Sequence, residues 1–205
     1  MPHQFGGAFY LYCVMLSPFE YVVVLTSIIL GMGITQLITG FAAIILRWKD
    51  VKLYWPHLVL IGLIFVIHIQ DWWATYALRN NTSWNLPMFL FIILYPVNLY
   101  ILARILFPIK WTPVPVDLKA FFFENFRKIY LFMMFLPVHS LIENLFIRDY
   151  MLKDQVVQFA LIIALGSIVI PNKKDEWVHK ALAILFIVIC IASMVIGWNE
   201  FVIAA

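Results

Sequence analysis

The sequence predicts an all-α integral membrane protein built as a bundle of about six transmembrane helices. Hydrophobic residues make up 64% of its 205 residues and charged residues only 12%, whereas a soluble domain is roughly half apolar and a quarter charged. The apolar residues form long runs, and roughly 20 such residues cross a bilayer as a helix. The runs lack the strict alternation of a membrane β-barrel, and the chain length suits one domain.

The start of the first predicted span is the best marked. Ser17 and Glu20 have the spacing of a capping box, and Pro18 suits the first turn of a helix. Met15 offers a start of its own, so residues 1–14 could lie upstream of the natural start. The predicted division of the chain is a short N-terminal extension at 1–16 and a single six-helix domain at 17–205.

The fourth span is the weakest of the six. Its charge-free run covers only 129–142, which is too short to cross the hydrocarbon core alone. To cross, it must place Glu143 toward one interface, or Arg127 and Lys128 toward the other. The spans are predicted at 19–46, 54–78, 85–106, 124–147, 155–171 and 178–201.

The basic residues predict the orientation. Of the 14 Lys and Arg residues, all but Arg79, Arg148 and Lys153 fall on one side of the six-span arrangement. Basic residues near span ends mark the cytoplasmic side, which places the N- and C-termini on the non-cytoplasmic side. Tryptophans flank the spans on both sides, as expected for membrane interfaces. We expect the protein to lie in a bacterial cytoplasmic (inner) membrane, with the lipid bilayer as its main partner.

Small residues recur every four positions along the first span. This spacing allows two helix backbones to approach closely in lipid. The stripe is interpreted as a packing seam, inside the bundle or between subunits, or as a polar wall beside a permeation path. We expect a homo-oligomer, because six helices of this length enclose little interior of their own. The stripe consists of Ser27, Gly31, Thr35, Thr39 and Ala43.

Several polar residues fall where the bilayer makes them costly, which marks them as functional candidates. Residues three or four apart share one face of a helix, so His68 and Asp71 form a stripe in the second span. His139 and Glu143 do the same in the fourth. Others lie near the same outer boundary. The candidate set for a polar vestibule, or an ion or proton path, is His68, Asp71, Arg79, His139, Glu143, Glu20 and Glu200.

Three interpretations of this set remain open. The groups could pair with one another and tie the helices together. They could line an outward-facing, water-filled vestibule that binds a cation or relays protons, since imidazole titrates near neutrality. They could also ligate zinc or iron through His68, His139, Asp71 and Glu143, or a b-type haem through the two histidines. No H-E-x-x-H or Cys/His cluster supports a metal, so no cofactor is predicted.

The function that the sequence favours is transport-like: a channel or carrier subunit for a small ion or solute. A membrane-embedded metal or haem redox enzyme using His68 and His139 is the first alternative. A structural or regulatory membrane partner without a site is the second. Nucleophile, phosphate-loop and dinucleotide motifs are absent from the sequence. The basic residues follow the orientation rule, so no nucleic-acid partner is expected.

Overall fold

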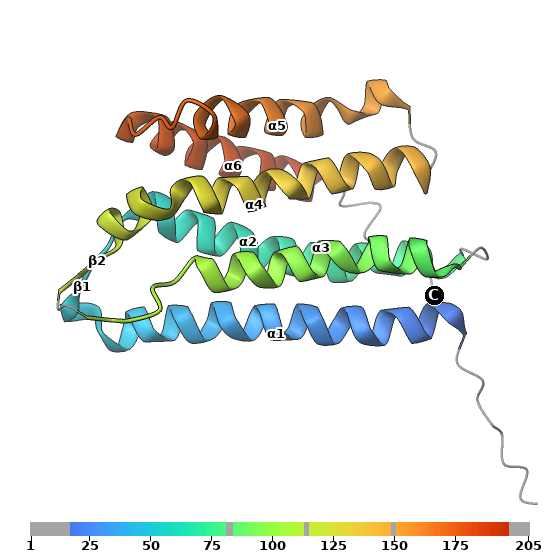
Figure 1. Cartoon of the computed structure of the whole chain (residues 1–205), viewed down its shortest axis with the longest axis horizontal. Helices are drawn as coiled ribbons and strands as arrows, with labels where there is room; N and C mark the ends of the chain where they lie inside the picture. The colour runs from blue at the N-terminus through green and yellow to red at the C-terminus, as the bar shows by residue number, and fades with distance from the viewer. Residues whose placement is uncertain (1–16, 81–83, 113–114, 149–150, 197–205) are drawn as a thin grey trace, which may run out of the picture.

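The computed structural model describes residues 17–80, 84–112, 115–148 and 151–196. In these ranges six long helices lie side by side as a bundle (Figure 1). Each is long and apolar enough to cross a membrane, α2 together with the short helix η2 and α5 together with η3. The long helices are α1 (Pro18–Leu46), α2 (Trp55–Thr75), α3 (Leu86–Ile105), α4 (Leu118–Phe146), α5 (Val156–Val169) and α6 (Glu176–Ile196). The short 3-10 helices are η1 (Trp48–Asp50), η2 (Tyr76–Asn80) and η3 (Leu152–Gln155).

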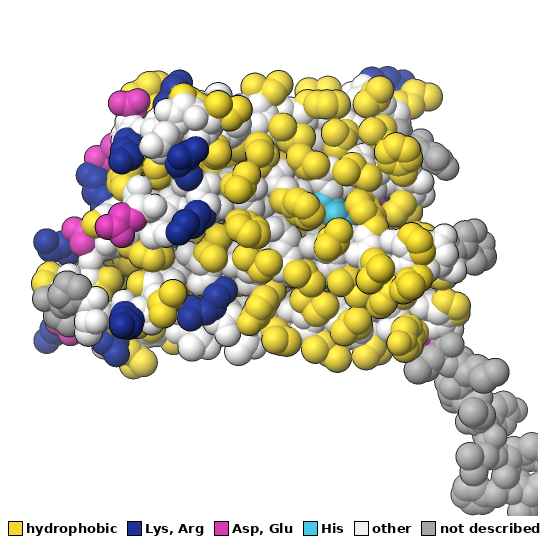
Figure 2. Space-filling model, in the orientation of Figure 1, with side chains coloured by type: hydrophobic (Ala, Val, Ile, Leu, Met, Phe, Trp, Pro, Cys, Tyr) yellow, Lys and Arg dark blue, Asp and Glu magenta, His cyan; other side chains and the backbone are white. Residues whose placement is uncertain are grey.

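The outer surface of the bundle is apolar along its middle and charged at one end. Large apolar side chains such as Ile28, Ile163 and Val188 are more than half exposed, as expected of side chains that face lipid. Figure 2 shows the Lys and Arg side chains of this face gathered mainly at one end. That end, called the basic end below, contains the last turn of α1 and the first turns of α2 and α4 (Figure 1).

The start of α1 confirms the predicted capping box. The Ser17 hydroxyl accepts a hydrogen bond from the Glu20 N–H at 3.2 Å, and the Ser17 N–H donates to Glu20 Oε2 at 2.6 Å. Two N–H groups without a partner inside the helix are thereby satisfied. The Glu20 carboxylate is therefore used within the first turn of its own helix.

The fourth helix begins earlier than predicted. α4 starts at Leu118, six residues before the predicted boundary at 124, and has 29 residues. Asp117 caps it, since its Oδ1 accepts from the N–H groups of Lys119 and Ala120. Arg127 and Lys128 lie in its first half, toward the basic end, and Glu143 lies in its last turn. A capped helix that is longer than its apolar run accommodates charges that a purely apolar span could not.

Two very short strands join the loops at the basic end, and sequence reasoning did not predict them. β1 (Val51–Lys52) follows α1 and η1, and β2 (Val116–Asp117) precedes α4. They pair in parallel, with Val51 opposite Val116 and Lys52 opposite Asp117. The pairing satisfies loop backbone groups and joins the α1–α2 connection to the start of α4.

Two ion pairs link charged side chains at the same end of the bundle. Lys119 Nζ of α4 lies 2.5 Å from a Glu176 carboxylate oxygen of α6, and Lys180 lies 2.9 Å from the other. These side chains are substantially exposed, so the pairs are expected to contribute little stability. Burial, and then the Glu176 carboxylate, raise the pKa of the nearby Tyr54 phenol to about 12. Tyr54 therefore stays neutral at physiological pH.

Two glycines of α1 allow close packing with the rest of the bundle. A Cβ built on Gly33 would overlap the imidazole of His68 in α2. A Cβ on Gly40 would lie 2.5 Å from the ring of Phe107, which follows α3. α1 packs against both α2 and α3, while α4 packs against α3 and α5. These contacts set the rotation of α1 about its own axis.

Candidate functional site

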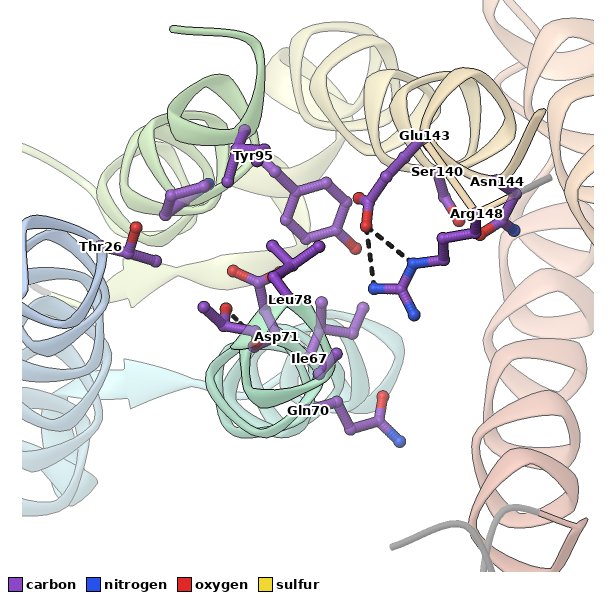
Figure 3. Close-up of a pocket in the computed structure, with 14 residues that line it drawn as sticks. Thr26, Ile67, Gln70, Asp71, Leu78, Tyr95, Ser140, Glu143, Asn144 and Arg148 are labelled. Atoms are coloured by element: carbon purple, nitrogen blue, oxygen red, sulfur yellow. Dashed lines mark hydrogen bonds and ion pairs between the residues drawn. The ribbon is translucent and has the colours of Figure 1, made fainter. Parts of the chain in front are cut away.

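A cavity of about 270 Å³ lies between α1, α2, α3 and α4 in the half of the bundle away from the basic end (Figure 3). It begins near the last turn of α2 and the end of α4. Apolar residues of α2, η2 and α3 complete its walls. The polar side chains that line it are Thr26, Gln70, Asp71, Thr75, Tyr95, Ser140, Glu143, Asn144 and Arg148. We call this space the acidic vestibule.

An ion pair forms one wall of the acidic vestibule. Glu143 Oε1 accepts hydrogen bonds from Arg148 Nε at 3.0 Å and Nη2 at 2.8 Å (Figure 3). The backbone N–H of Arg148 also donates to the Glu143 carbonyl, where α4 ends. Glu143 lies in the last turn of α4 and Arg148 just after that helix ends, so the pair does not itself tie two helices together.

Asp71 supplies a second carboxylate from α2. Its Oδ2 is buried and has no hydrogen-bond partner among the described residues. Its backbone carbonyl accepts from the Thr75 hydroxyl at 2.8 Å, which orients that hydroxyl toward the helix. A buried polar atom without a partner is costly. With both acids ionised, the vestibule carries two carboxylates against one guanidinium.

Tyr95 of α3 lies between the two acids. In Figure 3 its ring stands between Asp71 and Glu143, with the hydroxyl directed toward Glu143. Thr26 of α1 faces the vestibule from the opposite side, and its hydroxyl is buried without a partner among the described residues. Sequence reasoning missed Tyr95 and Thr26 because uncharged hydroxyls are common in membrane helices. They become functional candidates only because they line the same cavity as Asp71.

The two predicted histidines do not line the acidic vestibule. His68 Nδ1 donates to the Ile64 carbonyl at 2.7 Å, and its ring is packed against Gly33 of α1. His139 Nε2 donates to the Phe91 carbonyl at 2.8 Å. The His139 ring also stacks on the Phe91 ring, with centroids 4.1 Å apart and planes within 9°. The two imidazoles are thus held by different helices.

Neither a metal cluster nor a histidine pair is assembled in the part of the chain that the structure describes. No group of three His, Cys, Asp or Glu side chains there could hold a metal ion. His68 and His139 use one ring nitrogen each on a backbone carbonyl. The arrangement therefore lends no support to the metal and haem interpretations.

The remaining candidates lie apart from the vestibule or outside the described residues. Arg79 does not line it, since its guanidinium carbon lies 4.0 Å from the centroid of the Tyr76 ring in η2. Glu20 is held in the capping box of α1. Glu200 lies outside the described residues. Asp71 and Glu143 are therefore the predicted acids that the structure brings into one cavity.

The middle of the stripe of small residues lies on the exposed side of α1, while Ser27 and Ala43 at its two ends are half-buried. Gly31, Thr35 and Thr39 are exposed, and a Cβ added to Gly31 would contact nothing within 4 Å. The Thr35 hydroxyl donates to the Gly31 carbonyl at 2.8 Å. The face of α1 buried against the other helices is a different one. Contact between subunits through the stripe stays a prediction.

Comparison with known proteins adds no further information about this cavity. No protein-family model, curated protein or solved structure matches the chain. The chemistry of the acidic vestibule therefore has to be inferred from its own geometry.

Proposed function

We propose that the chain is a membrane protein with a transport-like role, a channel or carrier subunit that binds a small cation or cationic solute in the acidic vestibule. The observation that carries this proposal is the buried Asp71 Oδ2, which no described residue satisfies. An unpaired carboxylate inside a membrane span is expensive. A cation entering the vestibule would relieve that cost, whereas an anion would meet the excess of carboxylates.

The direction of access follows from the charge distribution. The basic end gathers most of the Lys and Arg side chains on the face shown in Figure 2, and the positive-inside rule assigns such an end to the cytoplasm. The acidic vestibule lies toward the other end. We therefore propose that it opens outward, with both termini on the non-cytoplasmic side.

The competing interpretations have less support from the geometry. Among the predicted acids, Asp71 is the one that could pair with a residue of a helix next to α2, and its Oδ2 has no partner among the described residues. The redox interpretation needs the histidines to converge, and their rings engage α1 and α3 separately. A Soret band or stoichiometric zinc or iron in purified protein would nevertheless favour it over transport.

Flux through liposomes tests the proposal. Purified protein is reconstituted, and entry of radiolabelled sodium, rubidium and methylammonium is measured separately. We expect at least one cation to enter, and Asp71→Asn to reduce that entry roughly tenfold or more, because a charge-assisted contact is lost. The matched control is Asp154→Asn, an exposed acid in η3, which should leave entry unchanged.

Two results would contradict the proposal. The first is a protein that folds and reconstitutes but admits none of the three cations. The second is equal entry through the wild type and Asp71→Asn.

A further inference from the structure

A second cavity of about 330 Å³ lies between α2, α4, α5 and α6. Its walls are mainly hydrocarbon, with Leu63 from α2, Met133 from α4, Leu161 from α5 and Phe186 from α6. Both its size and its apolar lining are typical of sites that enclose part of an organic ligand. We call it the apolar cavity.

The apolar cavity adjoins the acidic vestibule. Four residues line both spaces: Ile67, Gln70, Tyr95 and Ser140. The Gln70 amide belongs to the wall between them and donates to the Ser193 hydroxyl of α6 at 3.4 Å. One ligand could therefore have its two ends in the two cavities, on either side of this shared wall.

Buried acceptors without partners occur in both cavities. Asp71 Oδ2 in the acidic vestibule has a counterpart in Gln158 Oε1, which lines the apolar cavity from α5. Neither atom has a hydrogen-bond partner among the described residues. An ionised carboxylate and an amide oxygen only accept hydrogen bonds. A ligand group that satisfies the Asp71 carboxylate must therefore bring N–H or O–H donors.

We propose that the ligand is an amphipathic organic cation: its ammonium group binds at Asp71, and its hydrocarbon part occupies the apolar cavity. This inference rests on the proposed cation-binding function and narrows its ligand class. A bare metal ion or a proton would use the carboxylate but leave the adjoining apolar cavity without a role. An ammonium group carries both a positive charge and N–H donors, and Asp71 Oδ2 has no such partner among the described residues.

A series of straight-chain primary amines tests the inference. Binding of methyl-, propyl-, butyl- and hexylammonium to the full-length protein in lipid nanodiscs is measured by calorimetry, with protein-free nanodiscs subtracted. Each methylene transferred into an apolar cavity is expected to tighten binding about fourfold. Asp71→Asn should weaken every member of the series by a similar factor.

Filling the apolar cavity tests the hydrocarbon part of the ligand separately from its ammonium group. Leu161→Trp should abolish the gain with chain length while leaving methylammonium binding within about twofold. Ile163→Trp on the same helix is the control, since Ile163 is 69% exposed on the outside of the bundle. Cys190→Phe fills the same cavity from α6 and serves as a second variant if Leu161→Trp does not fold.

The outcomes distinguish failure of the amphipathic-ligand inference from failure of the proposed cation-binding function. If affinity depends on Asp71 but does not change with chain length, the inference of an amphipathic ligand is wrong. The proposed cation-binding function would still be supported. No saturable binding of any amine overturns the amphiphile, while sodium or rubidium flux that depends on Asp71 would still support transport. A chain-length gain that persists in Leu161→Trp and Cys190→Phe reflects partition into lipid and also overturns the inference.

Discussion

Gly33 of α1 allows close contact with His68 of α2 because it has no side chain. Its Cα faces the His68 imidazole so closely that a Cβ would overlap the ring. His68 is fully buried there, with one nitrogen bonded to its own helix. Gly31, two positions earlier, has open space around it. Two glycines of the same helix therefore have opposite tolerance for a methyl group.

Gly33→Ala is expected to destabilise the protein by about 1–3 kcal/mol, because overpacking forces either α1 or the imidazole to move. The measurement is the thermal unfolding midpoint of purified protein in detergent. Gly31→Ala should leave the midpoint unchanged or raise it slightly, since alanine favours a helix over glycine. Equal effects of the two substitutions would show that the contact with His68 does not limit packing.

The Glu143–Arg148 pair predicts that two substitutions change the affinity for methylammonium in opposite directions. Glu143→Gln removes a negative charge from the acidic vestibule, and we expect weaker methylammonium binding. Arg148→Gln removes the positive charge that opposes the acids, and we expect tighter binding. A change of roughly threefold to tenfold each way corresponds to charges several ångströms apart in a partly screened site. Calorimetric titration in nanodiscs measures both, and shifts in the same direction would contradict the electrostatic role.

At the scale of the element, the start of α4 depends on Asp117. Its carboxylate accepts from two backbone N–H groups, and its backbone lies in the short pairing of β1 with β2. The cap precedes the charged first half of α4, where the charges made the start of the helix difficult to predict. The length of α4 positions Glu143 and Ser140 at the acidic vestibule.

Asp117→Ala is expected to cost about 1 kcal/mol, the usual effect of losing a helix N-cap. The midpoint of thermal unfolding in detergent should fall accordingly. Asp50→Ala, an exposed acid in η1, is the matched control and should have a smaller effect. If both substitutions lower the midpoint equally, the loss comes from changing surface charge and not from the cap.

At the scale of the whole molecule, the unequal ends of the bundle predict its orientation. In a background without Cys13 and Cys190, Lys174→Cys marks the turn before α6 at the basic end, and Asp154→Cys marks η3 at the other end. A membrane-impermeant maleimide should label Asp154→Cys in intact cells and Lys174→Cys only after permeabilisation. The reverse pattern would place the acidic vestibule on the cytoplasmic side and remove the outward-facing part of the proposal.

Much of the helical arrangement could be predicted from local sequence. The six apolar runs correspond to the six helices, because crossing a bilayer requires a long run whose backbone bonds are satisfied internally. The capping box at Ser17 and Glu20 was also predictable, since it depends on a spacing of three residues. The start of α4 was not, because Asp117 caps a helix whose first turns carry charges that a hydropathy criterion rejects.

What the sequence alone determined is which polar residues fall inside apolar runs, and therefore which ones the membrane makes costly. Only the tertiary structure decided which of them meet. Asp71 and Glu143 line one cavity with Tyr95, while His68 turns to Gly33 and His139 stacks on Phe91. The physical reason is that the rotation of each helix about its axis is set by packing against its neighbours, and no local pattern encodes those contacts.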